Sequence, residues 1–321
     1  MRLTIFAMIL SLSVVIAAHA QELPPAPGEL FEVNGQQMHL SCTGEGEITV
    51  LIEAGVGGFS LNFSELQGEL NEHTRVCSYD RLGYGWSDPL PNNTFDLDTA
   101  TANLHNLFNV AEVPPPYLVI SHSFGAAITR AYHAAYPGEI VGMVFLDAVH
   151  PDLAVQVEGY SAALERQLDQ LGPLVALIGN LSEANATDQL PDTPAGQPAA
   201  DVQDAFVEIV TREAFLDVVR AEGRYLAEAL PTVVLPSTVG ELPLVVVTHG
   251  MPERFTFLGA WMGAEQAAQA EETWQALQRD LTTLAPDARL VVATESRHSI
   301  HQDQPELVVS LVLAMLKDLS A

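Results

Sequence analysis

The sequence predicts an α/β fold built on an open, mostly parallel β-sheet. Short runs of β-branched and other apolar residues recur along the chain, and segments with helical periodicity lie between most of them. Six of these runs are continuously apolar, which is typical of strands buried on both faces of a parallel sheet. The chain has 321 residues, 48% of them hydrophobic, so it is long enough to bury a large core.

The first predicted strands are antiparallel and the later ones parallel. Residues 30–34 and 38–42 flank Gly35, which predicts a β-hairpin. The six apolar runs follow in order at residues 48–53, 74–79, 117–121, 141–147, 242–248 and 289–294. Helical periodicity is found between or after these strands at residues 99–110, 125–136, 264–284 and 305–319.

One long interval interrupts this alternation. From Asp147 until the approach to Leu242 no convincing strand is found, and the segment is rich in Ala, Leu, Gln and Glu. It predicts helices over residues 153–177 and 201–230, separated by an exposed loop at 180–200. We interpret the interval as a helical insertion that covers one end of the sheet. The predicted division is a core of residues 21–152 and 236–321 and a cap of residues 153–235.

The first twenty residues have the pattern of a secretory signal peptide. Arg2 provides a positive charge, residues 3–16 form an apolar stretch, and Ala18-His19-Ala20 matches a small-x-small cleavage site. A membrane anchor is the alternative, but the stretch is shorter than the ~20 apolar residues of a spanning helix. We therefore expect cleavage after Ala20, no membrane anchor after cleavage, and a secreted or periplasmic location.

Charge and cysteine content limit the partners and the compartment. The chain carries 13 Lys and Arg against 41 Asp and Glu, a net charge of −28 at pH 7. Such a chain repels phosphate backbones and anionic membranes, so nucleic-acid binding is not expected. The two cysteines, Cys42 and Cys77, can form one disulfide in an oxidising compartment or stay as two buried thiols.

A nucleophile is predicted where the strand at residues 117–121 meets the next helix. The segment Ser121-His122-Ser123-Phe124-Gly125 has the form small-x-Ser-x-Gly. A serine on a sharp strand-to-helix turn needs small neighbours two positions away, so that strand and helix can approach each other. Its hydroxyl is then exposed at a helix N-terminus, where backbone N–H groups stabilise an oxyanion. Ser123 is the predicted nucleophile, and an incidental turn serine is the alternative.

A serine nucleophile needs a base and an acid that orients the base. In this motif the acid and then the histidine follow the serine along the chain. His298 is the predicted base, because it follows the last predicted strand and precedes the final helix. Asp147 and Glu253 each follow a strand that flanks the same crevice. We prefer Asp147, because Glu253 lies in a Pro-containing loop beside Arg254.

The second oxyanion donor is predicted in a glycine-rich loop. Residues 54–58, with the sequence Ala-Gly-Val-Gly-Gly, follow the strand at 48–53, and the N–H of Val56 is the predicted partner of the Phe124 N–H. A tight turn that needs positive φ would have the same composition. The loop lacks the Lys-Ser/Thr ending of a phosphate-binding loop, and no His, Cys and carboxylate cluster has metal-ligand spacing. We therefore expect no metal and no cofactor.

Four motifs, in this order, resemble the α/β-hydrolase fold family. They are the glycines of residues 54–58, Tyr79-Asp80-Arg81-Leu82-Gly83-Tyr84-Gly85-Trp86-Ser87, the Ser123 segment, and His298 before Asp303-Gln304-Pro305-Glu306. The resemblance covers nearly the whole mature chain. It implies an eight-stranded, mostly parallel sheet with an antiparallel second strand, a helical cap inserted after strand six, and a Ser-Asp-His triad. It also places the second strand beside the fourth, which favours a disulfide between Cys42 and Cys77.

Three features bear on this resemblance: two departures from the usual motifs and the position of the triad acid. Ser121 stands where the motif usually has glycine, and Ala54 stands where members of the family usually have histidine. Many members carry the triad acid after the seventh strand, as Glu253 would be, and others carry it after the sixth, as Asp147 would be. The resemblance therefore leaves both acids open.

The predicted chemistry is acyl transfer to water through an acyl-enzyme on Ser123. Dehalogenase and epoxide-hydrolase relatives carry an aspartate at the position of Ser123, so their chemistry is not expected. A carboxylesterase for small to medium acyl substrates is the preferred function. An amidase or aminopeptidase-like hydrolase and a non-catalytic ligand-binding protein of the same fold are the alternatives. The expected substrate-lining residues are Gly55, Phe59, Trp86 and Leu153.

Overall fold

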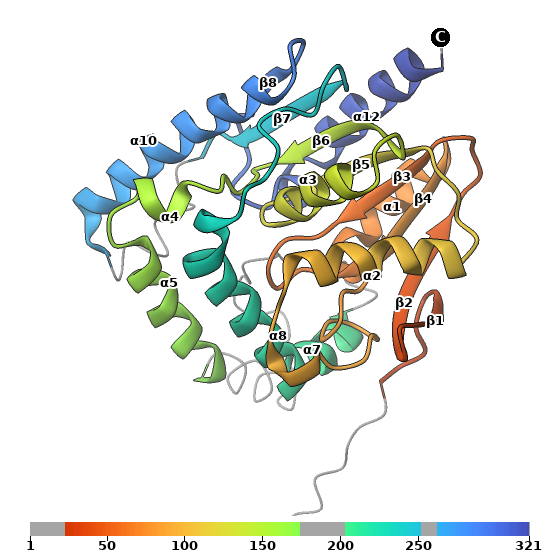
Figure 1. The fold of residues 1–321 in the computed structure, drawn as a ribbon, viewed down its shortest axis with the longest axis horizontal. Helices are drawn as coiled ribbons and strands as arrows, with labels where there is room; N and C mark the ends of the chain where they lie inside the picture. Colours follow the sequence, from red (N-terminus) through yellow and green to blue (C-terminus); the bar gives the residue numbers. More distant parts are fainter. Residues whose placement is uncertain (1–22, 174–202, 252–261, 321) are drawn as a thin grey trace, which may run out of the picture.

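The structure is a computed structural model that describes residues 23–173, 203–251 and 262–320. The predicted signal peptide, the predicted loop at 180–200 and Glu253 therefore lie outside the described residues. The core is an eight-stranded sheet with the strand order β1-β2-β4-β3-β5-β6-β7-β8 (Figure 1). The strands are β1 (Glu29–Val33), β2 (Gln36–Thr43), β3 (Thr49–Glu53), β4 (Arg75–Tyr79), β5 (Tyr117–His122), β6 (Ile140–Leu146), β7 (Leu244–His249) and β8 (Arg289–Ala293).

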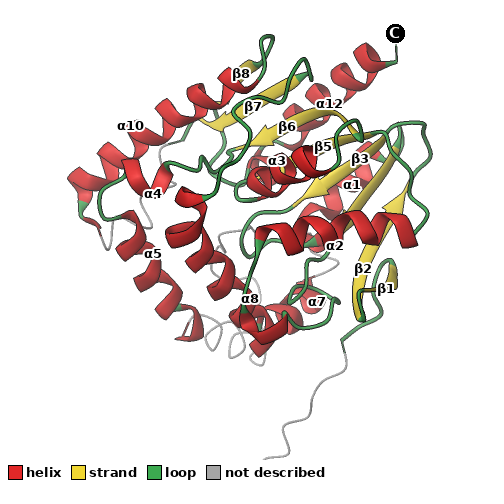
Figure 2. Cartoon of the chain, in the orientation of Figure 1, coloured by secondary structure: helices red, strands yellow, loops and turns green. Residues whose placement is uncertain are grey.

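Helices lie on both sides of this sheet (Figure 2). Those of the core are α1 (Ser64–Leu70), α2 (Leu97–Val110), α3 (Gly125–Ala135), α10 (Ala264–Leu281), α11 (Ile300–Asp303) and α12 (Pro305–Leu319). Those between β6 and β7 are α4 (Leu153–Gln156), α5 (Tyr160–Asp169), α7 (Gln203–Val210) and α8 (Glu213–Arg224). Within the described ranges, no helix combines the length and apolar composition needed to cross a bilayer.

The strand directions confirm the predicted topology. β2 runs antiparallel to both β1 and β4, and the pairs from β4 to β8 are all parallel. The β1–β2 hairpin turns at Asn34 and Gly35, whose φ values are 55° and 83°. Positive φ at both central residues is what a tight hairpin turn requires, and Asn-Gly supplies it with little strain.

Burial on both faces explains the continuous apolar runs. On one face Leu51 and Val119 pack in the cluster that includes α2 and α3, and on the other Val50 and Ile120 pack in the cluster that includes α1 and α12. Successive side chains of a strand point to opposite faces, so a strand covered on both sides is apolar throughout. β8 is the exception, because it is the edge strand and Val292 is 49% exposed. The prediction that this run is buried on both faces is wrong.

The inserted helices occupy the predicted interval but are shorter than predicted. The predicted helix at 153–177 breaks after α4, where Val157 is extended and Gly159 has a φ of 79°. The predicted helix at 201–230 is interrupted at Arg212, which is extended, and continues as α8 and a π-helical turn at Tyr225–Ala229. The helices α1 and α11 were not predicted, because seven and four residues carry too little periodicity.

The disulfide favoured by the resemblance is present. Cys42 in β2 and Cys77 in β4 are direct partners across the antiparallel pair, and their sulfur atoms are bonded. Cys77 is fully buried. The bond therefore joins the antiparallel start of the sheet to its parallel part.

Candidate active site

Ser123 sits on a sharp turn between β5 and α3. Its φ is 52°, a left-handed value that is rare outside glycine and that stores strain at functional turns. Two backbone hydrogen bonds hold the turn against the end of β6. The Ser123 N–H donates to the Leu146 carbonyl at 3.0 Å, and the Val149 N–H donates to the Ser123 carbonyl at 2.9 Å. Both the N–H and the carbonyl of Ser123 are therefore bonded to the segment at the end of β6.

The small residues around Ser123 are required by close backbone contacts. A Cβ on Gly125 would lie 2.5 Å from the Glu53 carbonyl oxygen, and one on Gly55 would lie 2.9 Å from Ser123 Cβ. Real Cβ atoms do not approach other atoms so closely. Ser121, which replaces the usual glycine, is accommodated because its hydroxyl lies 2.7 Å from that of Thr129 on α3. The substitution therefore adds a strand-to-helix hydrogen bond.

The structure brings His298 to Asp147. Asp147 follows β6 directly, is fully buried, and has a φ of 46°. The His298 Nδ1–H donates to Asp147 Oδ2 at 2.6 Å. Burial alone would raise the pKa of Asp147, but hydrogen bonds from His249 and His298 hold it well below its usual range. Asp147 is thus an ionised carboxylate that orients the ring of His298.

A second histidine binds the same carboxylate. The His249 Nδ1–H donates to the two Asp147 oxygens at 2.8 and 2.9 Å, and its Nε2–H donates to Glu271 Oε1 at 2.8 Å. The Trp274 indole N–H donates to Asp147 Oδ1 at 2.9 Å. Burial would lower the pKa of His249, but the hydrogen bonds to Asp147 and Glu271 raise it to about 9. His249 is therefore charged at neutral pH.

Sequence reasoning did not predict these partners of Asp147. His249 ends β7, and nothing in the sequence connects it to Asp147. Trp274 and Glu271 belong to α10, whose buried face includes Ala270, Trp274, Leu277 and Leu281. The helical period of that face could have identified Trp274 as buried, but not its partner.

Two other histidines surround His298. The His122 Nε2–H donates to the His298 carbonyl at 3.1 Å, and their ring centroids lie 4.6 Å apart. Since His122 precedes Ser123, this contact joins the nucleophile turn to the histidine loop. His301, three residues after His298, belongs to α11. It is buried and stacks on Phe63 with centroids 4.1 Å apart, because α11 turns it inward, and burial holds its pKa well below the usual range.

The predicted oxyanion donors lie on either side of the turn. Phe124 begins α3, and Val56 belongs to the oxyanion loop, which we define as residues 54–58. Among the described residues, neither the Val56 N–H nor the Phe124 N–H donates to a protein acceptor. By contrast, the Gly57 N–H donates to Tyr84 Oη at 2.9 Å and the Gly58 N–H to the Gly55 carbonyl at 3.1 Å.

The residues predicted to line the substrate site lie in different parts of the fold. Phe59 is fully buried and stacks on Phe206 of α7, with centroids 5.6 Å apart. Leu153 of α4 is buried in the same apolar cluster as Phe124. Trp86 lies toward the N-terminal segment, because its indole N–H donates to the Pro24 carbonyl at 2.7 Å. Phe59 and Leu153 thus connect the core to the cap. The substrate-lining role of Gly55, Phe59, Trp86 and Leu153 stays a prediction.

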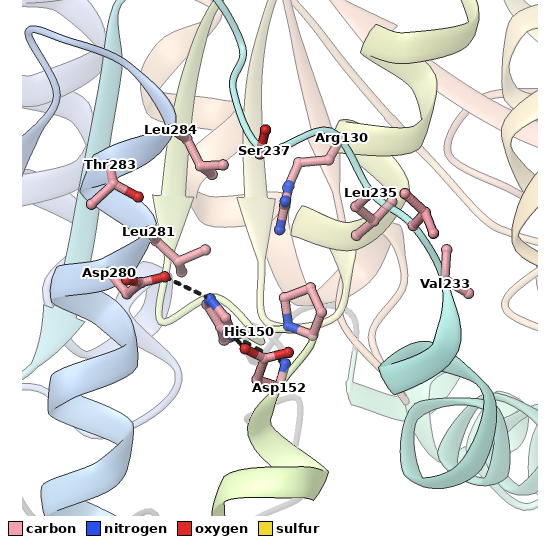
Figure 3. A pocket seen from close by; sticks show the side chains of 12 residues that line it. Arg130, His150, Asp152, Val233, Leu235, Ser237, Asp280, Leu281, Thr283 and Leu284 are labelled. Carbon is pink, nitrogen blue, oxygen red and sulfur yellow. Dashed lines mark hydrogen bonds and ion pairs between the residues drawn. The ribbon is translucent and has the colours of Figure 1, made fainter.

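A hollow of about 270 Å³ lies beside α3 and α10, away from this site (Figure 3). Arg130 points into it, and the His150 Nε2–H donates to Asp280 Oδ2 at 3.1 Å. Its lining contains neither Ser123 nor His298. Across the part of the chain that the structure describes, no group of three or more His, Cys, Asp or Glu is arranged to hold a metal ion.

Comparison with known proteins agrees with this geometry. Residues 50–311 match the model described as the alpha/beta hydrolase family. The uncharacterized protein YqjL of Bacillus subtilis is 25% identical over 280 residues, which cover 87% of each chain. A thermophilic esterase from Thermogutta terrifontis superposes with a TM-score of 0.61 at 16% identity, over 91% of this chain and 99% of the esterase. An epoxide hydrolase mutant from Bacillus megaterium superposes with a TM-score of 0.61 at 14% identity, over 90% and 100%. At such identities the solved structures establish the fold alone.

Proposed function

The chain belongs to the alpha/beta hydrolase family, and from this premise we propose that it is a serine hydrolase that cleaves carboxylic esters of small to medium acyl chain length. The observation that carries the proposal is the 2.6 Å hydrogen bond from His298 Nδ1 to Asp147, beside the strained turn of Ser123. A buried carboxylate that holds Nδ1–H makes Nε2 the nitrogen that accepts a proton.

In the proposed reaction, Ser123 Oγ attacks the ester carbonyl carbon and its proton passes to His298 Nε2. The N–H groups of Val56 and Phe124 donate to the carbonyl oxygen as it becomes negatively charged. The bond to the leaving alcohol then breaks, and the imidazolium returns the proton to the departing oxygen. Water attacks the acyl-enzyme with His298 again as the base, which releases the carboxylic acid and restores the serine hydroxyl.

The nucleophile itself favours ester over epoxide chemistry. A serine that opened an epoxide would form an ether. Water does not hydrolyse an ether at neutral pH, so the enzyme would stop after one cycle. An acyl-serine is an ester and is hydrolysed readily. The apolar cluster in which Phe59 of the core packs against Phe206 and Phe215 of the cap supports an apolar acyl group as the part of the substrate that is recognised.

The first test combines covalent labelling with turnover. We expect a fluorophosphonate probe to add one adduct on Ser123, seen by intact mass, and the protein to hydrolyse p-nitrophenyl acetate, butyrate and octanoate. Ser123→Ala should abolish the adduct and lower kcat by at least ~10³-fold, since a triad without its nucleophile retains little rate.

The controls distinguish the alternative functions. Matched p-nitroanilides of the same acyl groups are measured in parallel, and faster cleavage of the anilides would indicate an amidase instead. A folded wild-type protein that shows neither adduct nor turnover would contradict the proposal and favour a ligand-binding role. Preference among the three esters reports the size of the acyl site.

A further inference from the structure

Arg81 is the centre of a buried network that the proposed reaction does not use. It lies in the loop after β4 and is only 6% exposed. A guanidinium carries five N–H donors, and each of those of Arg81 has an acceptor. The acceptors are Glu222 Oε1 at 2.8 Å from Nε, Glu53 Oε1 and the Ala54 carbonyl at 2.8 Å from Nη1, and the Gly55 carbonyl at 2.9 Å and Glu222 Oε2 at 3.0 Å from Nη2.

Two of these acceptors belong to the oxyanion loop. The Gly55 carbonyl is bound by Arg81 and also by the Gly58 N–H. The Gly55–Val56 peptide is trans, since the cis bond found in the described residues joins Pro115 and Pro116. In a trans peptide, the carbonyl and the following N–H point in opposite directions. Arg81 therefore directs the Val56 N–H away from the guanidinium.

The network reaches the cap through Glu222 on α8. Its carboxylate binds Arg81 with both oxygens, and Oε2 also accepts the Tyr84 hydroxyl proton at 2.7 Å. The same Tyr84 oxygen accepts the Gly57 N–H. One carboxylate of the cap is thus connected to the oxyanion loop by two routes, through Arg81 and through Tyr84.

The charges make this network sensitive to the loss of a partner. Arg81 faces two carboxylates, Glu53 and Glu222, and both are at most 1% exposed. Burial raises the pKa of Glu53 to about 7, although Arg81 lowers it. A buried charge that loses its partner is strongly unfavourable, so its neighbours rearrange. We therefore expect removal of the Glu222 charge to change the position and the hydrogen bonds of the Arg81 guanidinium.

We propose that Arg81 and Glu222 are positioning residues that hold the Gly55–Val56 peptide in the orientation of an oxyanion hole, so that the hole forms only when α8 of the cap is seated. This inference rests on the proposed serine chemistry. The cap then does more than enclose the acyl group, because its position determines whether the transition state is stabilised. Ester turnover is coupled to cap closure by hydrogen bonds alone.

The test uses three variants of the full chain. Glu222→Gln keeps the shape of the side chain and removes its charge. Tyr84→Phe removes only the hydroxyl that joins Gly57 to Glu222, so it tests the second route from the cap to the oxyanion loop with less risk of misfolding. Asp217→Asn is the matched control, because Asp217 is also on α8 and also contacts the core, accepting from Asn93 Nδ2 at 2.8 Å, but touches no residue of the oxyanion loop.

Two readouts are measured for each variant. With butyrate esters, Glu222→Gln and Tyr84→Phe should lower kcat by about tenfold or more while KM stays within about threefold, since an oxyanion donor acts in the transition state. A trifluoromethyl ketone, which forms an oxyanion on Ser123, should bind more weakly by a similar factor. Amide hydrogen exchange of residues 54–60 should be faster in both variants and unchanged in Asp217→Asn.

The outcomes separate this inference from the proposed function. Folded Glu222→Gln and Tyr84→Phe proteins whose kinetics, ketone binding and exchange match Asp217→Asn would overturn the inference and leave the esterase proposal standing. A wild-type protein without adduct or turnover would overturn both the esterase and the oxyanion role. A rise in KM with unchanged kcat would also overturn the inference, because it would assign Glu222 to substrate binding.

Discussion

The carboxylate of Asp147 receives hydrogen bonds from two imidazoles with different electrostatic roles. His298 is 19% exposed and adjoins the nucleophile turn, whereas His249 is buried and paired on its other side with Glu271. A charged His249 partly neutralises Asp147 and so weakens the field that Asp147 exerts on His298. The two imidazoles thus share one carboxylate, and their hydrogen bonds explain how Asp147 stays ionised although it is fully buried.

The pKa of His249 leads to a prediction about stability. Its pKa is about 9 in the folded protein against 6.5 for an ordinary histidine. Because the folded value is the higher one, the stabilising contribution is complete below pH 6.5 and is lost as pH rises through about 9. His249→Asn should therefore be less stable than wild type at pH 6 by about 3 kcal/mol, and the difference should shrink toward pH 10. Urea unfolding at several pH values measures this difference.

His150 provides a control of opposite sign. Burial lowers its pKa below 6.5, so wild type should lose stability relative to His150→Asn as pH falls below that value. If the difference in free energy of unfolding between wild type and His249→Asn grew between pH 6 and pH 10, it would contradict the assignment of a charged His249.

The strands were predicted to within about two residues, because apolar runs are a local property of the sequence. The cap helices were less well predicted, since the chain leaves helical conformation at Val157, Gly159 and Arg212. The turn of Ser123 was predicted from small residues at fixed spacing, and the close contacts of Gly55 and Gly125 explain that spacing. The signal peptide and the Pro/Gly-rich loop stay predictions.

The disulfide between β2 and β4 should contribute measurably to stability. It closes a loop with a sequence separation of 35, for which the chain-entropy model gives about 3–4 kcal/mol. The double variant Cys42→Ala, Cys77→Ala should lose about that much free energy of unfolding. Dithiothreitol should lower the urea midpoint of wild type and leave the double variant unchanged. An unchanged wild-type midpoint, with both thiols shown to be reduced, would argue against this role.

The whole molecule carries a net charge of −28, while Arg81, a buried cation, is paired with carboxylates. Repulsion among surface carboxylates disfavours the compact state, and salt screens it. Raising NaCl from ~0.05 M to ~0.5 M at pH 7 should increase Tm by about 2–4 °C, measured by calorimetry. Near the sequence pI of about 4.4 the same salt should have little effect. A fall in Tm at pH 7 would show that attractive pairs dominate.

The sequence by itself predicted where the strands lie along the chain, the turn of Ser123 and His298 as the candidate base. Each of these depends on a local pattern, either an apolar run, small residues at fixed spacing, or a histidine between the last strand and the last helix. A local pattern is readable because the residues that make it are adjacent in the chain.

Only the tertiary structure shows that Asp147 contacts His298 and what else touches this carboxylate. Asp147 and His298 are 151 residues apart, and Arg81 and Glu222 are 141 apart. Asp147 and Glu253 follow neighbouring strands, so the sequence leaves both within reach of one histidine. A buried carboxylate needs hydrogen-bond donors, and His249 and Trp274 supply them to Asp147. Such a balance of burial and hydrogen bonding exists only once the chain has folded.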